Sequence, residues 1–396
     1  MKGIRAISAL LALILLFSCT TIRYESSSAQ AEDIIELYGS LRKNHKSFFN
    51  SVSRKDAESI VLSELEGAGE KDPAELFMSL SRIASLAHDS HTSVGISSQI
   101  VEFSDILPVG IYRFGNEYRV LLTTEENRAI LGRSLVAVNG KTLPEIKDAL
   151  KEYISYDNDV WLDSSFCSFF SFMFFLGKAG IEGESVVLSF DGGYEAEVGI
   201  IPYSEYIASE KASIEGSYPY LSNGYYGFCV IGDTLKINYN ICAEDPSYPV
   251  ASFVDDLEKA VNKNGIRRII VDLRFNGGGN SRVFEPIERF ISSSGLECLV
   301  LIGRNTFSSA ILNASSLRKA GFRTVGEKTG GSLNHYGEVV TGILGNSGIQ
   351  YSYSTKYFLN DSNAPSGSMV PDLIIEQSYD DYINGIDTVL MELGIE

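Results

Sequence analysis

The chain has 396 residues, of which 44% are hydrophobic, and it carries a formal net charge of −18 at pH 7. This length is enough for two or three structural units with buried cores. The negative charge argues against nucleic acid and anionic lipid as partners, because both are polyanions. Four histidines and five scattered cysteines without a CxxC pair argue against a zinc site. We expect no metal and no other cofactor.

The N-terminus has the pattern of an export signal. Lys2 and Arg5 precede an apolar stretch, which is typical of a secretory signal peptide rather than of a structural helix. The sequence LFSC resembles the bacterial lipobox, so we expect cleavage before Cys19 and attachment of lipid to its thiol; plain secretion is the alternative. Loss of two positive charges then leaves −20. We predict a signal peptide at 1–18, a lipid-anchored tether at 19–32, and an exported protein anchored to a bacterial membrane that faces the periplasm or the exterior.

Two regions of different periodicity follow. Residues 33–100 are helical in pattern, with apolar side chains at spacings of three and four and an Asp72-Pro73 helix start. Residues 101–205 change to short apolar segments separated by turns, which predicts a β-rich domain. Within it, GRSLVAVNGKTLPEIKDAL resembles the PDZ module, in which such a strand and turn precede the helix that flanks a peptide-binding groove. The aromatic stretch SSFCSFFSFMFFLG is too short to span a membrane and is more typical of a core or a groove lining.

Strands and helices alternate again in residues 206–396. The expected strands are 234–241, 268–274, 298–302 and 323–326, and the expected helices are 251–263, 282–292 and 309–319. Repeated strand–helix units indicate an α/β domain with a mostly parallel sheet, flanking helices and right-handed crossovers. In such sheets ligands bind beyond the carboxyl ends of the strands. We therefore expect a site in the turns that follow the strands.

Two of these turns carry residues that suit acyl transfer. IIVDLRFNGGGN places Gly277 after one strand, and IGRNTFSSA places Ser308 and Ser309 after the next. A glycine turn lets a backbone N–H approach a developing oxyanion, and a helix N-terminus also favours negative charge. The simpler alternatives are that Thr306 or Ser308 caps the helix, and that the glycines only form a tight turn. A phosphate loop is excluded because no GK[ST] follows, and the hydrolase elbow GxSxG is absent.

Three motifs in this order, VDLRFNGGG, NTFSSA and VGEKTGG, resemble the tail-specific or C-terminal processing family of serine peptidases. The tricorn protease core and the interphotoreceptor retinoid-binding protein share that fold. GGSLNHYGE, STKYF and VPDLII are similar to the exported bacterial branch of the family. The resemblance covers about Asp33 to the C-terminus and implies a ClpP/crotonase-like protease core. It implies a serine endopeptidase acting on unfolded or C-terminally presented proteins, with Ser308 as nucleophile and the N–H groups of Gly277 and Ser309 as oxyanion hole.

The resemblance offers two sources for the general base. The lysine of the family's TFGK motif is missing, because TGGS stands in its place. Ser90 and His91, in HDSHT, match the DxHT element of the tricorn-like arrangement. That match implies that His91 takes the proton of Ser308, while Ser90 orients His91 or relays to an acid. His335, in NHYGE, is the rival base.

The sequence does not identify the acid of this arrangement. The resemblance places a Glu about six residues before Pro371-Asp372, where Pro365 stands instead, and Asp361 and Glu338 are the alternatives. The missing acid leaves a second hypothesis, a catalytically weak or inactive protein that binds peptides or apolar ligands on the same fold. The expected partners are a peptide or protein substrate and a membrane through the lipid anchor. The oligomeric state, the cleavage preference and the disulfide pairing stay open.

Overall fold

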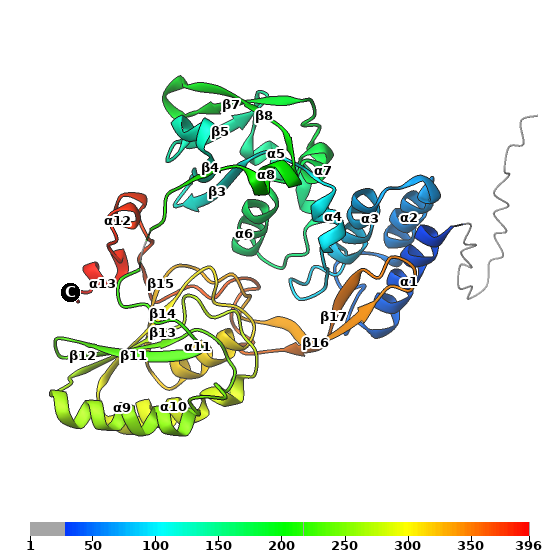
Figure 1. The fold of residues 1–396 in the computed structure, drawn as a ribbon. Helices are drawn as coiled ribbons and strands as arrows, with labels where there is room; N and C mark the ends of the chain where they lie inside the picture. Colours follow the sequence, from blue (N-terminus) through cyan, green and yellow to red (C-terminus); the bar gives the residue numbers. More distant parts are fainter. Residues whose placement is uncertain (1–27, 217, 396) are drawn as a thin grey trace, which may run out of the picture.

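The computed structural model describes residues 28–216 and 218–395 (Figure 1). The predicted signal peptide at 1–18 and the lipidation site at Cys19 lie outside the described residues. Three regions follow one another along the chain, one helical, one β-rich and one with alternating strands and helices. Figure 1 shows them grouped around a common centre. None of the helices in the described part of the chain is both long enough and apolar enough to cross a membrane.

The first region is a small helical unit. Its elements are α1 (Ala29–Asn44), α2 (Arg54–Leu65), η1 (Ala68–Glu70), α3 (Pro73–Ser85), β1 (Ser93–Val94) and α4 (Ser98–Glu102). Helix α1 begins at Ala29, which lies inside the range 19–32 that the sequence predicted as a tether. Helix α3 begins as predicted, with Asp72 and Glu75 forming a capping box and Pro73 in the first turn. The apolar stripes of α1 and α3 face each other through Leu37, Leu41 and Leu80, which are fully buried.

The second region is built on an antiparallel sheet. Its strands are β2 (Asp105–Ile106), β3 (Val109–Phe114), β4 (Glu117–Thr124), β5 (Ser134–Val138), β6 (Lys141–Thr142), β7 (Ser185–Phe190), β8 (Glu195–Gly199), β9 (Ile201–Pro202) and β10 (Lys211–Ser213). Its helices are η2 (Glu125–Ile130), α5 (Leu143–Leu150), η3 (Lys151–Tyr153), α6 (Asp159–Phe169), α7 (Met173–Leu176), η4 (Gly177–Ala179), η5 (Asp191–Gly193) and α8 (Tyr203–Ala208). The main sheet has the order β10-β4-β5-β7-β8, with β3 also on β4 and β6 on β5.

Two details of this region bear on the sequence predictions. Strand β10 pairs with β4, so the sheet extends past the boundary at residue 205. The aromatic stretch forms α6 and α7, and its Phe166, Phe170 and Phe175 are buried in the core that the β-rich region shares with the helical region. This stretch is therefore part of a core, as its length indicated.

The third region holds the predicted mostly parallel sheet. Its strands are β11 (Tyr226–Ile231), β12 (Thr234–Tyr239), β13 (Arg268–Asp272), β14 (Glu297–Ile302), β15 (Arg323–Gly326) and β18 (Leu373–Ile374). Its helices are α9 (Val250–Asn264), η6 (Ser281–Phe284), α10 (Glu285–Ser294), α11 (Ser309–Lys319), α12 (Tyr379–Ile383) and α13 (Thr388–Glu392). The strands lie in this order across the sheet, and only β11 is antiparallel to its neighbour.

Apolar runs explain why the central strands form. Ile269, Ile270 and Val271 of β13 are all fully buried, because helices cover both faces of the sheet. Side chains from α9, α10 and α11 pack on one face, and side chains from α13 pack on the other. The predicted α/β arrangement of this region is confirmed.

A long hairpin connects the third region to the first. It consists of β16 (His335–Ile343) and β17 (Gln350–Phe358), and Figure 1 shows it reaching toward α1–α3. Strand β1 pairs with β17, with Ser93 opposite Ser352. Asp33 of α1 accepts hydrogen bonds from the N–H groups of Asn346 and Ser347 at the tip of the hairpin. These contacts bring the loop before β1 to the edge of the parallel sheet.

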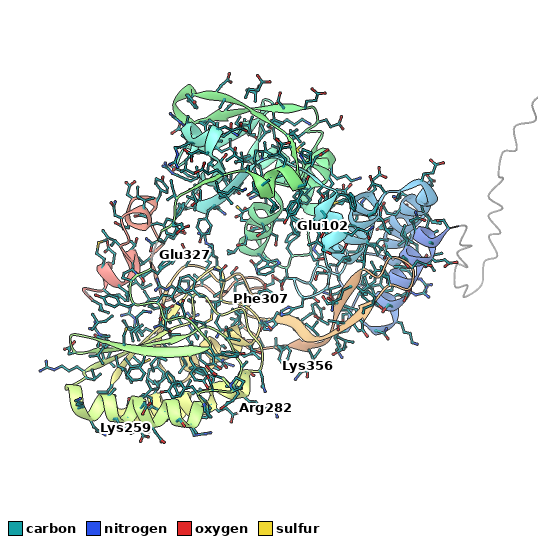
Figure 2. The ribbon with its side chains drawn as sticks, viewed as in Figure 1. Glu102, Lys259, Arg282, Phe307, Glu327 and Lys356 are labelled. Carbon is teal, nitrogen blue, oxygen red and sulfur yellow. The ribbon has the colours of Figure 1, made fainter. Side chains whose placement is uncertain are left out.

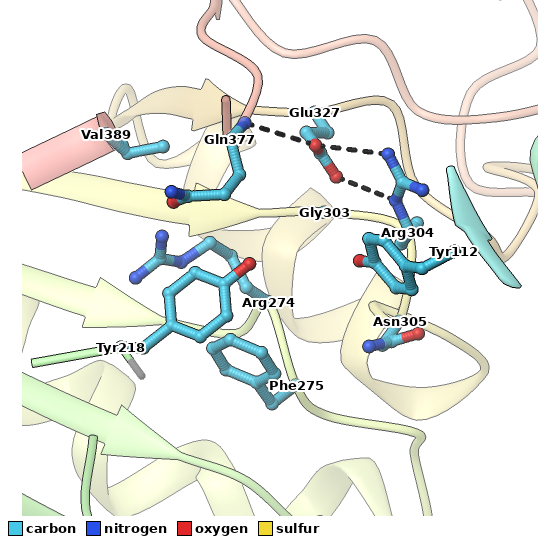
Figure 3. Close-up of a pocket in the computed structure, with 10 residues that line it drawn as sticks. All are labelled: Tyr112, Tyr218, Arg274, Phe275, Gly303, Arg304, Asn305, Glu327, Gln377 and Val389. Atoms are coloured by element: carbon cyan, nitrogen blue, oxygen red, sulfur yellow. Dashed lines mark hydrogen bonds and ion pairs between the residues drawn. The ribbon is translucent and has the colours of Figure 1, made fainter. Parts of the chain in front are cut away.

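The β-rich region touches the parallel sheet around a small cavity, shown in Figure 3. Arg304, just after β14, donates to the carbonyl oxygen of Arg113 on β3 (2.6 Å) and pairs with Glu327 after β15 (3.1 Å). The guanidinium of Arg304 lies 4.9 Å from the ring centre of Tyr112, also on β3. The cavity has a volume of about 20 Å³, which is room for about one water molecule. It is a junction between regions and is too small to hold a peptide.

Candidate active site

The turn after β14 is fixed by Thr306. This fully buried side chain donates to the carbonyl oxygen of Leu273 (2.8 Å) and accepts from the N–H of Gly303 (2.9 Å). The carbonyl oxygen of Thr306 accepts from the N–H of Gly331 (3.0 Å). Thr306 therefore joins the turns that follow β13, β14 and β15. The simpler alternative, that it caps the following helix, does not hold.

Ser308 has a strained backbone. It precedes the first residue of α11, and its φ of 51° with ψ of −122° lies in a region that L-residues rarely adopt. Such a conformation costs on the order of 1–3 kcal/mol and is concentrated at functional sites. The Ser308 hydroxyl makes no capping hydrogen bond to the helix, and the residue is partly exposed. The strain therefore presents a free hydroxyl at the N-terminus of α11.

The glycine turn after β13 packs directly on Ser308. Gly278 has a φ of 107°, and a Cβ on it would lie 2.6 Å from Ser308 Cβ. Asn276 holds this turn, because its Oδ1 accepts from the N–H of Gly278 (2.8 Å) and its carbonyl oxygen accepts from the N–H of Phe307 (3.0 Å). Only a residue without a side chain allows this approach.

Two backbone donors flank the serine. Within the part of the chain that the structure describes, the N–H groups of Gly277 and Ser309 donate no hydrogen bond. The Ser309 hydroxyl donates to the carbonyl oxygen of Gly279 (2.5 Å), which ties the helix start to the glycine turn. The two N–H groups predicted as oxyanion donors are thus free and lie on the two segments that meet at Ser308.

The ring of His91 lies next to the residue that precedes Ser308. Its ring lies 4.4 Å from that of Phe307 and 5.5 Å from that of His335, at interplanar angles of 27° and 14°. Trp161 of α6 stacks on Phe307 at 4.2 Å. Figure 2 places Phe307 where the three regions meet. The structure thus brings together His91 and the residue that precedes Ser308, although they are more than two hundred residues apart in the sequence.

Asp89 organises the loop that carries His91. Its Oδ1 accepts from the N–H of His91 (2.9 Å), and its Oδ2 accepts from the hydroxyl of Thr92 (2.6 Å) and from His45 Nε2 (3.2 Å). His45 Nδ1 accepts from the N–H of Ser47, so its proton is on Nε2. Burial raises the pKa of Asp89, but the hydrogen bonds from His45 and His91 outweigh burial and hold that pKa well below its usual range. A negative charge is therefore fixed 3.6 Å from His91 Nδ1.

His335, the rival base, is also part of the site. Its Nδ1 lies 2.9 Å from the carbonyl oxygen of Ser332, so Nδ1 carries the proton. Burial, with the charge of His91 as a smaller cause, lowers the pKa of His335 to about 4. Its ring stacks on His91 and on Phe358. His335 is therefore a neutral neighbour of His91 at neutral pH.

The two acids proposed from the sequence lie on the surface. Glu338 is exposed and faces Lys356 at 3.8 Å, and Asp361 is exposed and accepts from the N–H of Asn363. Within the described chain, neither carboxylate makes a contact with Ser90 or His91. The structure instead places Asp157 beside these residues. The sequence analysis missed Asp157, because it stands in a loop of the β-rich region, far from every motif of the site.

Comparisons with known proteins give similarity at the level of structure and none at the level of sequence families. No family model matches the sequence, and no curated protein matches it. Among solved structures, mature CPAF in complex with lactacystin matches with a TM-score of 0.62 and 11% identity, over 90% of this chain and 96% of that chain. The tricorn protease matches with a TM-score of 0.45 and 14% identity, over 93% of this chain and 36% of that one. The photosystem II D1 C-terminal processing protease matches with a TM-score of 0.42 and 13% identity, over 92% and 99%. The chain therefore shares the fold of CPAF.

Proposed function

We propose that this protein is a serine endopeptidase in which Ser308 attacks a peptide carbonyl and forms an acyl-enzyme. The observation that carries the proposal is the conformation of Ser308. Ser308 has a strained backbone at the start of α11, and its hydroxyl does not cap the helix. It packs against the glycine turn, where the N–H of Gly277 is free. If Ser308 had only a structural role, we would expect its hydroxyl to make a hydrogen bond or its backbone to be unstrained. The shared fold with CPAF supports the same proposal.

In the proposed mechanism His91 carries the proton. His91 accepts the proton of the Ser308 hydroxyl as the hydroxyl attacks, and later gives it to the leaving amine. The N–H groups of Gly277 and Ser309 stabilise the oxyanion of the tetrahedral intermediate. The nearby Asp89 carboxylate favours the imidazolium that forms on His91. Both ring nitrogens of His91 lack a hydrogen-bond partner here, and such bonds often tighten only when substrate binds.

We also propose roles for the remaining regions. The β-rich region at 101–205 acts as a PDZ-like domain that binds an extended peptide by strand addition and passes it to the core at 206–396, of ClpP/crotonase-like type. Its strand β3 contacts Arg304, four residues before the nucleophile. This contact supports transfer of a bound peptide from the β-rich region to the core. Residues 33–100 supply Ser90 and His91. The protein is exported and anchored through lipid on Cys19.

The proposal is tested by incubating one disordered protein with the wild type and with each variant, and by detecting the released peptides with mass spectrometry. Wild type is expected to release peptides from it over time, and Ser308→Ala and His91→Ala are not. A serine-reactive phosphonate is expected to label wild type at Ser308. An unlabelled Ser308 together with tight binding of intact peptide would overturn the proposal and favour the binding protein.

Replacing Gly278 by alanine is expected to displace the nucleophile. The new Cβ would lie 2.6 Å from Ser308 Cβ, closer than van der Waals contact allows. A displacement of about 1 Å can cost roughly 100-fold in rate, so kcat is expected to fall by at least about that factor. Gly265→Ala is the matched control, because Gly265 has a φ of 62° with open space around its Cα. Equal kcat values in the two variants would contradict this prediction.

The lipid anchor has a direct test in cells. Cys19→Ser is expected to abolish labelling by radioactive palmitate and to move the protein from the membrane fraction to the soluble fraction. The control is Cys298→Ser, because Cys298 is a buried free thiol in β14. Unchanged labelling of the Cys19 variant would show that this cysteine is not the lipidation site.

A further inference from the structure

Four buried polar atoms near the nucleophile have no hydrogen-bond partner among the described residues. They are Ser90 Oγ, His91 Nδ1, His91 Nε2 and Asp157 Oδ2. Ser90 and His91 are 7% and 9% exposed. A single buried polar atom without a partner costs stability, so such atoms are rare in folded proteins. Four of them in one cluster indicate groups arranged for a purpose other than stability.

Asp157 is held in this cluster by its neighbour Asn158. The Asn158 amide donates to Asp157 Oδ1 (3.0 Å), to the carbonyl oxygen of Gly330 (2.7 Å) and to Ser332 Oγ (3.0 Å). Gly331 of the same turn packs on the nucleophile, since a Cβ on it would lie 3.2 Å from Ser308 N. The carboxylate is therefore fixed to the wall of the site through Oδ1, and Oδ2 stays available.

Several groups shift the pKa of Asp157. Burial, together with the charge of Asp89, raises the pKa of Asp157 to about 6. The hydroxyls of Ser332 and Ser90 and the charge of His91 favour its ionised form. Burial mainly raises the pKa of Tyr357 on β17, and the negative charge of Asp157 is a smaller cause. Ser90 and His91 are thus both near enough to Asp157 to influence its pKa.

Asp89 is less suited to orient His91. Its two oxygens already accept from the His91 N–H, the Thr92 hydroxyl and His45 Nε2. Its Oδ1 is 3.6 Å from His91 Nδ1, which is too long for a hydrogen bond. Asp89 therefore fixes the loop and supplies charge, and the hydrogen bond to Nδ1 must come from another group.

We propose that Asp157 is the acid that positions His91, acting through the hydroxyl of Ser90. The Ser90 hydroxyl donates to Asp157 Oδ2 and accepts from the Nδ1–H of His91, which leaves Nε2 free to take the proton of Ser308. Asp157 gains no proton in this scheme; the proton goes from Ser308 to His91 and then to the leaving amine. This inference rests on the proposed peptidase function, and it places the acid in the β-rich region rather than in the C-terminal segment that the resemblance indicated.

Asp157→Asn separates this role from a structural one. The variant keeps the side-chain volume and the Oδ1 acceptor for Asn158. It is expected to lower kcat by at least about 100-fold with KM little changed, because an orienting acid acts mainly on the transition state. The pKa of Asp157 is higher in the folded state than in the unfolded state. The free energy of unfolding therefore falls as the pH rises from about 4 through 6. Asp157→Asn is therefore expected to raise the Tm at pH 8 and to leave it unchanged near pH 4.

The pH profile gives a second measurement. In wild type, the acid side of the log kcat/KM profile is expected to include the ionisation of Asp157, and this ionisation is expected to be absent from the profile of Asp157→Asn. Ser90→Ala is expected to lower kcat by a similar factor, with little further loss in the double variant. Asp361→Asn and Glu338→Gln, at the exposed acids, are the matched controls and are expected to retain wild-type kcat.

The outcomes distinguish this inference from the proposed function. Full activity of Asp157→Asn, or a kcat that falls together with the Tm, would overturn the role of Asp157 while Ser308→Ala remains inactive. Activity that survives in Ser308→Ala would overturn the peptidase itself. A lower kcat with a higher Tm at pH 8 supports the inference.

Discussion

Replacing Ser308 by alanine is expected to lower kcat for peptide hydrolysis by roughly five to six orders of magnitude. Alanine removes the attacking oxygen and leaves the free N–H groups of Gly277 and Ser309 in place, so weak catalysis by oxyanion stabilisation is expected to remain. The substitution touches no capping hydrogen bond, and the unfolding curve is expected to stay close to that of wild type.

A glycine at the same position gives a sharper result. The φ of 51° at Ser308 is strained for serine and allowed for glycine. Ser308→Gly is therefore expected to be as inactive as Ser308→Ala, but more stable than Ser308→Ala by about 1 kcal/mol. The measurement is urea unfolding of both variants. Ser293→Ala on α10 is the control and is expected to keep wild-type activity. A glycine variant less stable than the alanine variant would show that this backbone is not strained.

The second large effect concerns stability rather than catalysis. Arg274, just after β13, makes paired hydrogen bonds to Asp272 and to Asp387, and Asp272 also pairs with Lys236 (2.9 Å). All four side chains are buried. Arg274→Met is expected to lower the free energy of unfolding by about 3–5 kcal/mol, because Asp387 is left as a buried charge without its partner. Figure 3 shows Arg274 beside Tyr218 and Phe275, whose ring contacts are lost too.

The pH dependence and a control test the cause of that loss. Burial raises the pKa of Asp272, but the charges of Arg274 and Lys236 outweigh it, so this pKa is held below its usual range. The stabilisation by Asp272 is therefore present above about pH 4 and is lost as the pH falls below it. Arg268→Ala is the control, because Arg268 forms an exposed pair with Glu297, and it is expected to cost at most about 1 kcal/mol. Equal losses in the two variants would contradict the prediction.

Much of the fold could be predicted because local patterns specify it. The apolar run of β13 and the periodic pattern of α11 gave bounds within two residues of the observed Arg268–Asp272 and Ser309–Lys319. The hairpin contact between β1 and β17 could not be predicted in this way. It pairs residues about 260 positions apart, and its strand β1 has only two residues and no periodicity of its own.

The sequence by itself determined which residues could carry the chemistry, since Ser308, the glycine run and His91 stand in motifs with local turn and helix-start patterns. Only the tertiary structure decided how they are used. The strained Ser308 packs against Gly278 and Gly331, which belong to two other turns. The position of Asp157, and its pKa of about 6, depend on burial by segments that are remote in the chain. Conformation and ionisation at this site arise from contacts between distant residues, and local sequence patterns carry no record of such contacts.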